Sequence, residues 1–458
     1  MTTIDTLKNK YHNLVDDAAF SEILTGSVYT LGARAVSAVI VLTTSIIIAR
    51  FYGPQMLGVL AMVNSFIVIV SIPSMMGTAT SILRLIPEHI SKYSVSSAFH
   101  VYRKTQYLVA AVSIGIGLSF LLASGLIADK IFAKPHLAHF FALAAIFVSF
   151  AALMDLNTQA VRGLRLIKTF ALMQVMPSFS MLAILLIASF FFRSNNDPVY
   201  AQFASWGLTA MAGIWIMDRA FRSRMRTDDK IHLLKAKDIA SLSIPMLMTN
   251  SMQFFISQTS VVMLGIFHGE SDVGYYSIAV KLATLTSFAL VAINSMIAPK
   301  FSELYHVEKM EELFHVARKS SKLIFWTAVP ILMVLVIFGS LILRWCFGKD
   351  FTVAYPAMVL LVAGQFVNAI SGPTQLFMSM TGHQKVLRDI IFVAALINIG
   401  LSVLLIPKYA INGAAVAGMV SLSYWNIHAL LFIKFTYGRS IGYIPLCRQH
   451  ATHNVRKT

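Results

Sequence analysis

Charge is the scarcest feature of this sequence. Only 12% of its 458 residues are charged, whereas 57% are hydrophobic; a soluble domain carries about 25% charged residues. The mean hydropathy is +0.72. These values exclude an ordinary soluble globular protein and indicate a chain that crosses a membrane many times, with about 20 mostly apolar residues in each spanning helix.

Cysteine is scarce as well, with only Cys346 and Cys447 present. We expect them on opposite faces of the membrane, which excludes an intramolecular disulfide. Gly-rich phosphate loops, metal-ligand clusters and serine–histidine constellations are also missing. His136 and His139 have a spacing that a metal could use, but two ligands alone predict a surface pair. We therefore expect no catalytic site, no metal and no cofactor, and a protein that is not an enzyme.

Acidic residues are outnumbered, with 20 Asp and Glu against 37 Lys and Arg, for a formal net charge of +17. Such a charge first suggests nucleic acid as a partner, but the placement of the basic residues argues against it. With the N-terminus inside, 28 of the 37 fall in inside segments and 7 in outside loops, while Arg34 and Lys281 lie within spans. This bias follows the positive-inside rule and predicts that both termini are cytoplasmic. It leaves no support for nucleic-acid binding.

Twelve apolar segments are long enough to span a membrane. Pro73 and Pro245 fall inside two of them, and we expect these two to be split or shortened. The polar stretches 84–104 and 300–322 follow the second span of each half, and the second stretch suggests a surface helix. The predicted spans are 24–49, 55–83, 106–127, 137–161, 170–192, 199–218, 239–266, 273–299, 322–345, 354–380, 389–407 and 411–434.

The chain contains an internal repeat that relates its first half to its second. The segment FHVYRKT at 99–105 reappears at 314–320 as FHVARKS, and Gly58 matches Gly274. Each half holds an even number of spans, so both begin on the same side of the membrane and form a parallel repeat. Many transporters are built from duplicated halves with the substrate path between them, and we expect this chain to be one.

The predicted domain boundaries follow from the repeat and from the polar stretches that flank the spans. An amphipathic cytoplasmic segment, with apolar residues spaced through 4–18, precedes the first span. A stretch with seven basic residues separates the halves as a cytoplasmic linker. We predict an N-terminal segment at 1–22, a six-helix lobe at 23–218, a basic linker at 219–238, a second six-helix lobe at 239–436 and a basic tail at 437–458.

Three motifs carry a resemblance to a known family. The junction RFYGPQMLG at 50–58, the pair VGYYSIAVK at 273–281 and APKFSE at 298–303, and NGAAVAG at 412–418 resemble segments of polysaccharide-transporter flippases. The resemblance covers residues 23–436, and its superfamily also includes multidrug extruders, lipid II flippases and O-antigen flippases. It implies a fold like that of multidrug and toxic compound extruders, with two six-helix lobes around a central cavity that opens alternately to each side.

The resemblance also implies a cargo. Such flippases move undecaprenyl-pyrophosphate-linked oligosaccharide, a repeat unit of O-antigen, capsule or exopolysaccharide, across the bacterial inner membrane. Membrane lipids would be partners, together with a polysaccharide polymerase and a chain-length regulator. Many relatives carry an aspartate in the seventh helix near Gln258 and Ser260, where this chain has no carboxylate. Coupling to a proton or sodium gradient is therefore left open.

Arg34 is the first candidate site residue. It lies near the middle of the first span, where a charge costs roughly 2.5–3.5 kcal/mol and is unlikely to face lipid. Thr30, Ser37 and Thr44 share its helix face. A guanidinium fork suits a pyrophosphate, so we expect Arg34 to contact that group in the cavity. The alternative is that a carboxylate such as Asp155 neutralises it.

Five further residues complete the predicted site. Lys281 either receives the pyrophosphate on the outward-facing side or extends to the interface. Asp155, the carboxylate placed within a span, either pairs with Arg34 or takes up a proton, unless Arg162 and Arg165 hold it at the surface. Asn250, Gln253 and Ser257 share one face of the seventh span, and their hydrogen-bonding groups suit a sugar-lined cavity, although such residues also join membrane helices.

Two rival functions stay open at this point. A multidrug or metabolite cation antiporter of the same superfamily would need a carboxylate in the cavity, for which Asp155 is the candidate. A membrane polysaccharide polymerase would need a sizeable aqueous domain, and the predicted outer loops are short.

Overall fold

The structure, a computed structural model of the chain, describes residues 18–191, 194–225, 234 and 236–443. These ranges are helical and contain no β-strand, which confirms the predicted all-α membrane fold. Helices pair their own backbone groups, as a chain in hydrocarbon must. Eight helices of the described ranges are long and apolar enough to span a membrane, and a bent pair, Glu270–Thr284 and Ser287–Ala298, makes nine.

The first half of the bundle, which we call the N-lobe, contains α2 to α8. Two short irregular helices, η1 at Ile127–Ile131 and η2 at Pro135–Leu137, connect α5 to α6. The N-lobe helices are α2 Ala18–Phe51, α3 Gly53–Met75, α4 Thr78–Lys92, α5 Val95–Leu126, α6 Ala138–Gly163, α7 Ile167–Phe191 and α8 Asp197–Arg222.

The second half, the C-lobe, contains α9 to α15. In α15 the backbone leaves the helical region at Ala410, shortly after Pro407, so this long helix holds two of the predicted spans. The C-lobe elements are α9 Ala236–Phe267, α10 Glu270–Thr284, α11 Ser287–His306, α12 Met310–Ile342, η3 Leu343–Phe347, η4 Lys349–Ala354, α13 Tyr355–Ser371, α14 Thr374–Met380 and α15 Gln384–Tyr437.

One of the two predicted proline breaks is present. Helix α3 ends just after Pro73, and Met76 and Gly77 then adopt positive φ angles of 48° and 76°. At Gly77 a Cβ would lie 2.2 Å from the carbonyl oxygen of Ser243, so only glycine fits where α4 approaches α9. The predicted break at Pro245 is wrong, because α9 is helical from Ala236 to Phe267.

Irregularities of the backbone recur in register with the sequence repeat. Helix α5 begins at Val95, just before one copy of the repeated heptapeptide, and α12 begins at Met310, just before the other. Each of these helices runs directly into a π-helical turn, η1 from Ile127 and η3 from Leu343. The second span of each half is also broken, between α3 and α4 and between α10 and α11. These matching breaks agree with the predicted parallel repeat.

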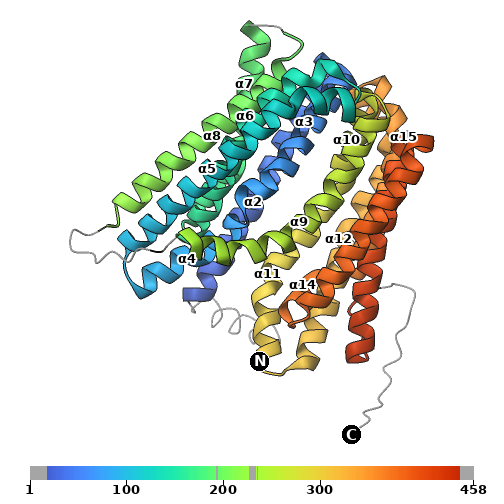
Figure 1. Cartoon of the computed structure of the whole chain (residues 1–458). Helices are drawn as coiled ribbons and strands as arrows, with labels where there is room; N and C mark the ends of the chain where they lie inside the picture. Colours follow the sequence, from blue (N-terminus) through green and yellow to red (C-terminus); the bar gives the residue numbers. More distant parts are fainter. Residues whose placement is uncertain (1–17, 192–193, 226–233, 235, 444–458) are drawn as a thin grey trace.

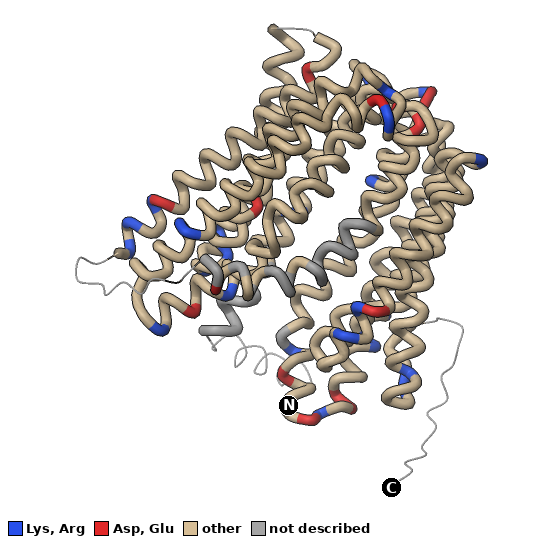
Figure 2. The backbone as a smooth tube through the Cα atoms, in the orientation of Figure 1, with Lys and Arg blue, Asp and Glu red and all other residues tan. Residues whose placement is uncertain are grey.

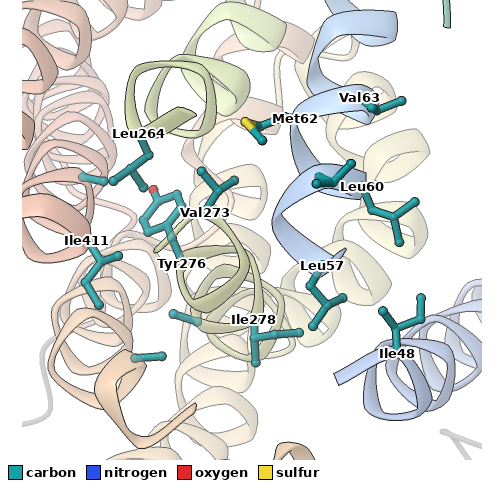
Figure 3. Packing of buried hydrophobic residues seen from close by; sticks show 14 of the residues in the cluster. Ile48, Leu57, Leu60, Met62, Val63, Leu264, Val273, Tyr276, Ile278 and Ile411 are labelled. Atoms are coloured by element: carbon teal, nitrogen blue, oxygen red, sulfur yellow. The ribbon is translucent and has the colours of Figure 1, made fainter. Parts of the chain in front are cut away.

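The two lobes approach each other at one end of the bundle. In Figure 1 they lie close together at the top and diverge toward the bottom, where α2 begins and α15 ends. We call the first the closed end and the second the open end. At the closed end, Leu57, Leu60 and Met62 of α3 pack with Val273 and Ile278 of α10 in one buried cluster (Figure 3). Burial of this apolar surface holds the lobes together there.

Charged residues gather at the two ends of the helices and are sparse between them, as Figure 2 shows. This is the arrangement that an apolar membrane interior requires, because a charge in hydrocarbon is costly. It agrees with a multi-pass membrane protein.

The predicted separate surface helix in the polar stretch 300–322 is wrong. That stretch instead contains the end of α11, a turn and the start of α12, and 84–104 likewise joins α4 to α5. The Ser94 hydroxyl accepts a hydrogen bond from the backbone N–H of Ser97 at 3.1 Å and thereby caps α5. The amphipathic segment before residue 18, residues 226–233 and 235 of the linker, and the tail beyond Tyr443 lie outside the described residues.

Candidate functional site

A cavity of about 690 Å³ lies between the lobes. It is bordered by the broken second span of the N-lobe, by α6, and by α9 and α15 of the C-lobe. Its size is that of a site for a small molecule or for part of a larger ligand. The lining residues are Ile72, Met75, Gly77, Ala79, Thr80, Leu83, Asp155, Gln159, Arg162, Leu247, Ile256, Ser257 and Trp425.

Helix α6 supplies the most polar wall of this cavity. Asp155, Gln159 and Arg162 line it, and their spacings of four and three positions place them on one helix face. The opposite face is anchored in the lobe, because Asn157 accepts a hydrogen bond from the Tyr102 hydroxyl at 2.8 Å and donates one to the Ala210 carbonyl at 3.3 Å. These buried bonds fix the rotation of α6 and so direct the polar face into the cavity.

The Gln159 side chain, one turn further along α6, lies close enough to the Asp155 carboxyl group to act on it. The predicted alternative, in which Asp155 neutralises Arg34, is wrong for this conformation. Arg34 takes part in none of the ion pairs among the described residues. Asp155 therefore faces the cavity with an amide partner and leaves Arg34 free for another anion.

Arg34 instead lies near Arg162, close enough for the two positive charges to act on each other. The Arg162 guanidinium sits over the ring of Phe170, 5.6 Å from its centroid, which holds it beside the cavity. The predicted pairing of Asp155 with Arg162 at the surface is absent from the ion pairs of the described chain. Two guanidinium groups thus stand near one another without a carboxylate between them.

Lys281 lies apart from the cavity. Its ammonium Nζ donates a hydrogen bond to the Ser45 hydroxyl at 2.8 Å, and Ser45 in turn donates to the Val41 carbonyl at 2.7 Å. Lys281 belongs to α10 and Ser45 to α2, so the bond crosses from the C-lobe to the N-lobe. The predicted extension of Lys281 to the interface is wrong here, since its amine is held within the protein.

The predicted polar stripe on α9 is described only in part. Ser257 lines the cavity, as predicted, whereas the side chains of Asn250 and Gln253 lie outside the described residues. Next to Ser257, the Gln258 side-chain oxygen accepts a hydrogen bond from Ser65 of α3 at 2.7 Å. The position near which relatives carry an aspartate is therefore a neutral contact between the lobes.

Polar groups close the bundle on the side away from the cavity. The Lys134 ammonium donates to the carbonyls of Gly265 and His268 at the end of α9, at 2.6 Å each. The imidazole of His136 lies 3.1 Å from the Glu270 carboxylate. His136 therefore contacts the other lobe, a partner that the sequence did not reveal.

Arg50 makes the complementary contact from α2 to the C-lobe. Its Nε donates to the Cys346 carbonyl at 3.0 Å, and its guanidinium also contacts the Trp345 carbonyl. Together with the Lys134 and His136 contacts, this places N-lobe side chains on C-lobe polar groups across the closed end. The lobes cannot separate there unless these contacts break.

Sequence reasoning did not place Gln159, Arg162 or Trp425 in the cavity wall, among other lining residues. Gln159 and Arg162 follow Asp155 at helical spacing, and that spacing was the available signal. Trp425 lies in the other half of the chain, and nothing in the sequence joins it to Asp155. Only the packing of α15 beside α9 brings it to the cavity.

Comparison with known proteins gives a consistent result. The statistical model of a family described as "Polysaccharide biosynthesis protein" matches residues 47–356. A probable low-salt glycan biosynthesis flippase of Haloferax volcanii is 24% identical over 192 residues, which cover 41% of this chain and 41% of that relative. The chain thus matches about two fifths of that relative's length.

Two solved structures share the fold. An inward-facing transporter of the multidrug resistance MATE family, of the MOP superfamily, superposes with a TM-score of 0.67 at 14% identity, covering 90% of this chain and 98% of that one. The lipid II flippase MurJ in an inward closed conformation gives a TM-score of 0.65 at 13% identity, covering 90% of this chain and 87% of that one. These likenesses confirm the predicted two-lobed transporter architecture.

Proposed function

The chain belongs to the family of polysaccharide biosynthesis proteins, and we propose that it is a flippase for undecaprenyl-pyrophosphate-linked oligosaccharide. The carried unit is a repeat of O-antigen, capsule or exopolysaccharide. The similarity to a probable glycan biosynthesis flippase and the fold shared with a lipid II flippase support this assignment. A carrier of this kind moves its substrate without making or breaking covalent bonds, so the protein is not an enzyme.

The observation that carries the proposal is the cationic side of the cavity. Arg162 lines it and Arg34 lies near Arg162, and neither is in an ion pair of the described chain. Two like charges that act on each other are unfavourable until an anion lies between them. A pyrophosphate supplies such an anion, with oxygens that match guanidinium forks. Arg34 and Arg162 therefore bind the pyrophosphate from two helices of one lobe.

Alternating access follows from the closure of one end of the bundle. The positive-inside bias assigns the open end to the cytoplasm, where the lipid-linked glycan is assembled. After loading, the contacts of Arg50, Lys134 and His136 across the closed end break, and the lobes close at the cytoplasmic end. The cavity then faces the periplasm and releases its cargo into the outer leaflet.

Two further residues act during this cycle. Lys281 is released from Ser45 when the lobes move, and its ammonium then receives the pyrophosphate on the outward-facing side. Asp155 takes up a proton from the cytoplasmic side or gives it up during return, which couples the cycle to a proton gradient. The hydroxyl of Ser257, with Asn250 and Gln253 on the same helix, binds the sugars.

A cation antiporter is the second candidate, and a specific observation favours it. The carboxylate of Asp155 faces the cavity without a basic partner among the described ion pairs. A hydrophobic cation could bind there. Arg162 on the same helix face would repel that cation, however, and this repulsion favours an anionic cargo.

The remaining assignments rest on the family. The protein resides in the cytoplasmic membrane of its cell with both termini inside, surrounded by lipids. A polysaccharide polymerase and a chain-length regulator receive the flipped units.

The leaflet location of the lipid-linked glycan tests the function. In cells depleted of the protein, the glycan should accumulate on the cytoplasmic side and the wild-type gene should restore delivery. Membrane-inserted Arg34→Ala and Arg162→Ala should fail to restore it, whereas Arg388→Ala should succeed, because Arg388 is exposed beside Asp389 and is not among the residues that line the cavity. Normal delivery during depletion would overturn the flippase and favour the antiporter.

A further inference from the structure

Trp425 is the aromatic residue of the cavity wall, and its polar atom has no partner. The indole nitrogen Nε1 is buried without a hydrogen-bond acceptor, while the side chain lines the cavity from α15. Buried polar groups are nearly always hydrogen-bonded, so each exception needs an explanation. Tryptophan in particular usually pairs its N–H when buried. The protein therefore leaves this donor unsatisfied in the conformation described.

The surroundings of Trp425 hold its ring in place. The side chain packs against a buried apolar cluster of the C-lobe that includes Phe377 of α14. The next residue, Asn426, donates to the Leu422 carbonyl at 2.9 Å and accepts from the Thr374 hydroxyl at 3.4 Å, which ties this turn of α15 to α14. The turn of α15 that carries the ring is thus fixed to α14, so this part of the backbone loses little freedom when a ligand binds.

The two lobes contribute different chemistry to the cavity. The N-lobe wall carries the charges and amide of Asp155, Gln159 and Arg162, whereas the C-lobe wall presents the ring of Trp425, the apolar side chains of Leu247 and Ile256, and the Ser257 hydroxyl. A sugar ring matches both walls, because it has an apolar C–H face and a rim of hydroxyl groups. A lipid tail alone would leave the indole N–H unpaired, at a cost in free energy.

We propose that Trp425 recognises the sugar of the lipid-linked glycan that lies next to the pyrophosphate. The ring packs against the apolar face of the pyranose, and Nε1 donates a hydrogen bond to a hydroxyl or carbonyl oxygen of that sugar. This inference rests on the proposed function and assigns the glycan a binding residue on the lobe opposite the pyrophosphate. One ligand then bridges the two lobes.

Binding of two lipids to the purified full-length protein tests the assignment. One lipid is the undecaprenyl-pyrophosphate-linked oligosaccharide, and the other is undecaprenyl pyrophosphate without sugar. Trp425→Phe keeps a ring and removes the donor, and Trp425→Leu removes both. The matched control is Trp326→Phe, whose side chain is 55% exposed on α12.

We expect Trp425→Phe to weaken binding of the glycolipid by about 3- to 10-fold, the worth of one hydrogen bond, and Trp425→Leu to weaken it further. Binding of undecaprenyl pyrophosphate should stay within about twofold in both variants. Equal losses for the two lipids, or no loss for either, would overturn the role in sugar recognition while leaving the flippase intact. Failure of the wild-type protein to bind either lipid would overturn both proposals.

A spectroscopic signal gives a second readout that does not depend on affinity. The difference between the fluorescence of the wild type and of Trp425→Phe isolates the emission of Trp425 from the other four tryptophans. Saturating glycolipid should shift this difference spectrum, and saturating undecaprenyl pyrophosphate should leave it unchanged. A shift of the same size with both lipids would contradict contact with the sugar.

Discussion

Gly58 and Gly274, equivalent residues of the two repeats, lie against each other where the lobes meet. A Cβ on Gly274 would lie 2.1 Å from the Pro54 carbonyl oxygen and 3.2 Å from the Gly58 nitrogen, and a Cβ on Gly58 would lie 1.7 Å from the Glu270 carbonyl oxygen. Helices α3 and α10 thus touch backbone to backbone. Small residues allow such close approach between membrane helices, and here they form the closed end.

Gly274→Ala should shift the bundle toward separation at the closed end. The added methyl overlaps backbone atoms, which cannot move aside as a side chain can, and overpacking of this kind costs about 1–3 kcal/mol. Spin labels at the exposed positions Lys130 and Lys349, with Cys346 and Cys447 replaced by serine, would report the distance between the lobes. Gly400→Ala is the control, since a Cβ there meets nothing within 4 Å; equal distances in both variants would contradict the prediction.

Lys281→Met should reduce the rate of flipping and leave substrate binding nearly unchanged. Lys281 is not among the residues that line the cavity, and its amine is held by Ser45 across the lobes. We expect the affinity for undecaprenyl pyrophosphate to stay within about twofold of the wild-type value. The flipping rate should fall at least tenfold, because a hydrogen bond to a charged group contributes about 1.5–3 kcal/mol.

Lys281→Gln separates charge from hydrogen bonding at the same position. Its amide can still donate to Ser45, so activity close to that of the wild type would show that the bond suffices. A rate as low as that of Lys281→Met would assign the role to the positive charge.

Asp155→Asn should preserve binding and remove the pH dependence of transport. The amide is nearly isosteric with the carboxyl group and can still pair with Gln159, but it carries no exchangeable charge. Flipping would be followed between pH 6 and pH 8 in vesicles, with Asp389→Asn, an exposed carboxylate on α15, as control. A variant that keeps the pH profile of the wild type would exclude Asp155 as the proton carrier.

The closed end should become more stable as the pH rises. Burial lowers the pKa of Lys134, and the carboxylates of Glu270 and Asp272 act in the opposite direction. When the lobes separate, the amine regains water and its pKa returns toward about 10.4. The separated state thus binds the proton more tightly than the closed state. The free energy therefore favours closure least at pH values below the lowered pKa, and it favours closure increasingly as the pH rises toward about 10.4.

The same spin labels would test this dependence between pH 7.5 and pH 10.5. Lys134→Gln, which keeps a donor for the Gly265 and His268 carbonyls, should flatten the slope. An unchanged slope in that variant would show that another group titrates.

Helix positions were predictable because each depends on its own stretch of sequence. The break after Pro73 was predicted from the proline itself, and the spans 389–407 and 411–434 were predicted from two apolar runs that lie within α15. The contact of Gly58 with Gly274 was not predictable, since a repeat identifies equivalent residues without saying that they touch.

The cavity was predictable only where one helix supplies its residues. Asp155 was identified because a carboxylate within a span is unusual, and Ser257 because of its spacing on α9. The proximity of Arg34 to Arg162 depends on how α2 packs in the N-lobe, and the place of Trp425 depends on the assembly of both lobes. Such relationships depend on tertiary packing, which no local pattern encodes.

The contacts of Lys134 and Arg50 have a consequence for how the sequence can vary. Both cations bind main-chain carbonyls of the other lobe, at His268 for Lys134 and at Trp345 and Cys346 for Arg50. Every amino acid offers the same carbonyl, so the side chains at these three positions can change without loss of the contact. At the closed end we therefore expect substitutions of the two N-lobe cations to be poorly tolerated. Substitutions of the three C-lobe residues whose carbonyls they bind should be tolerated.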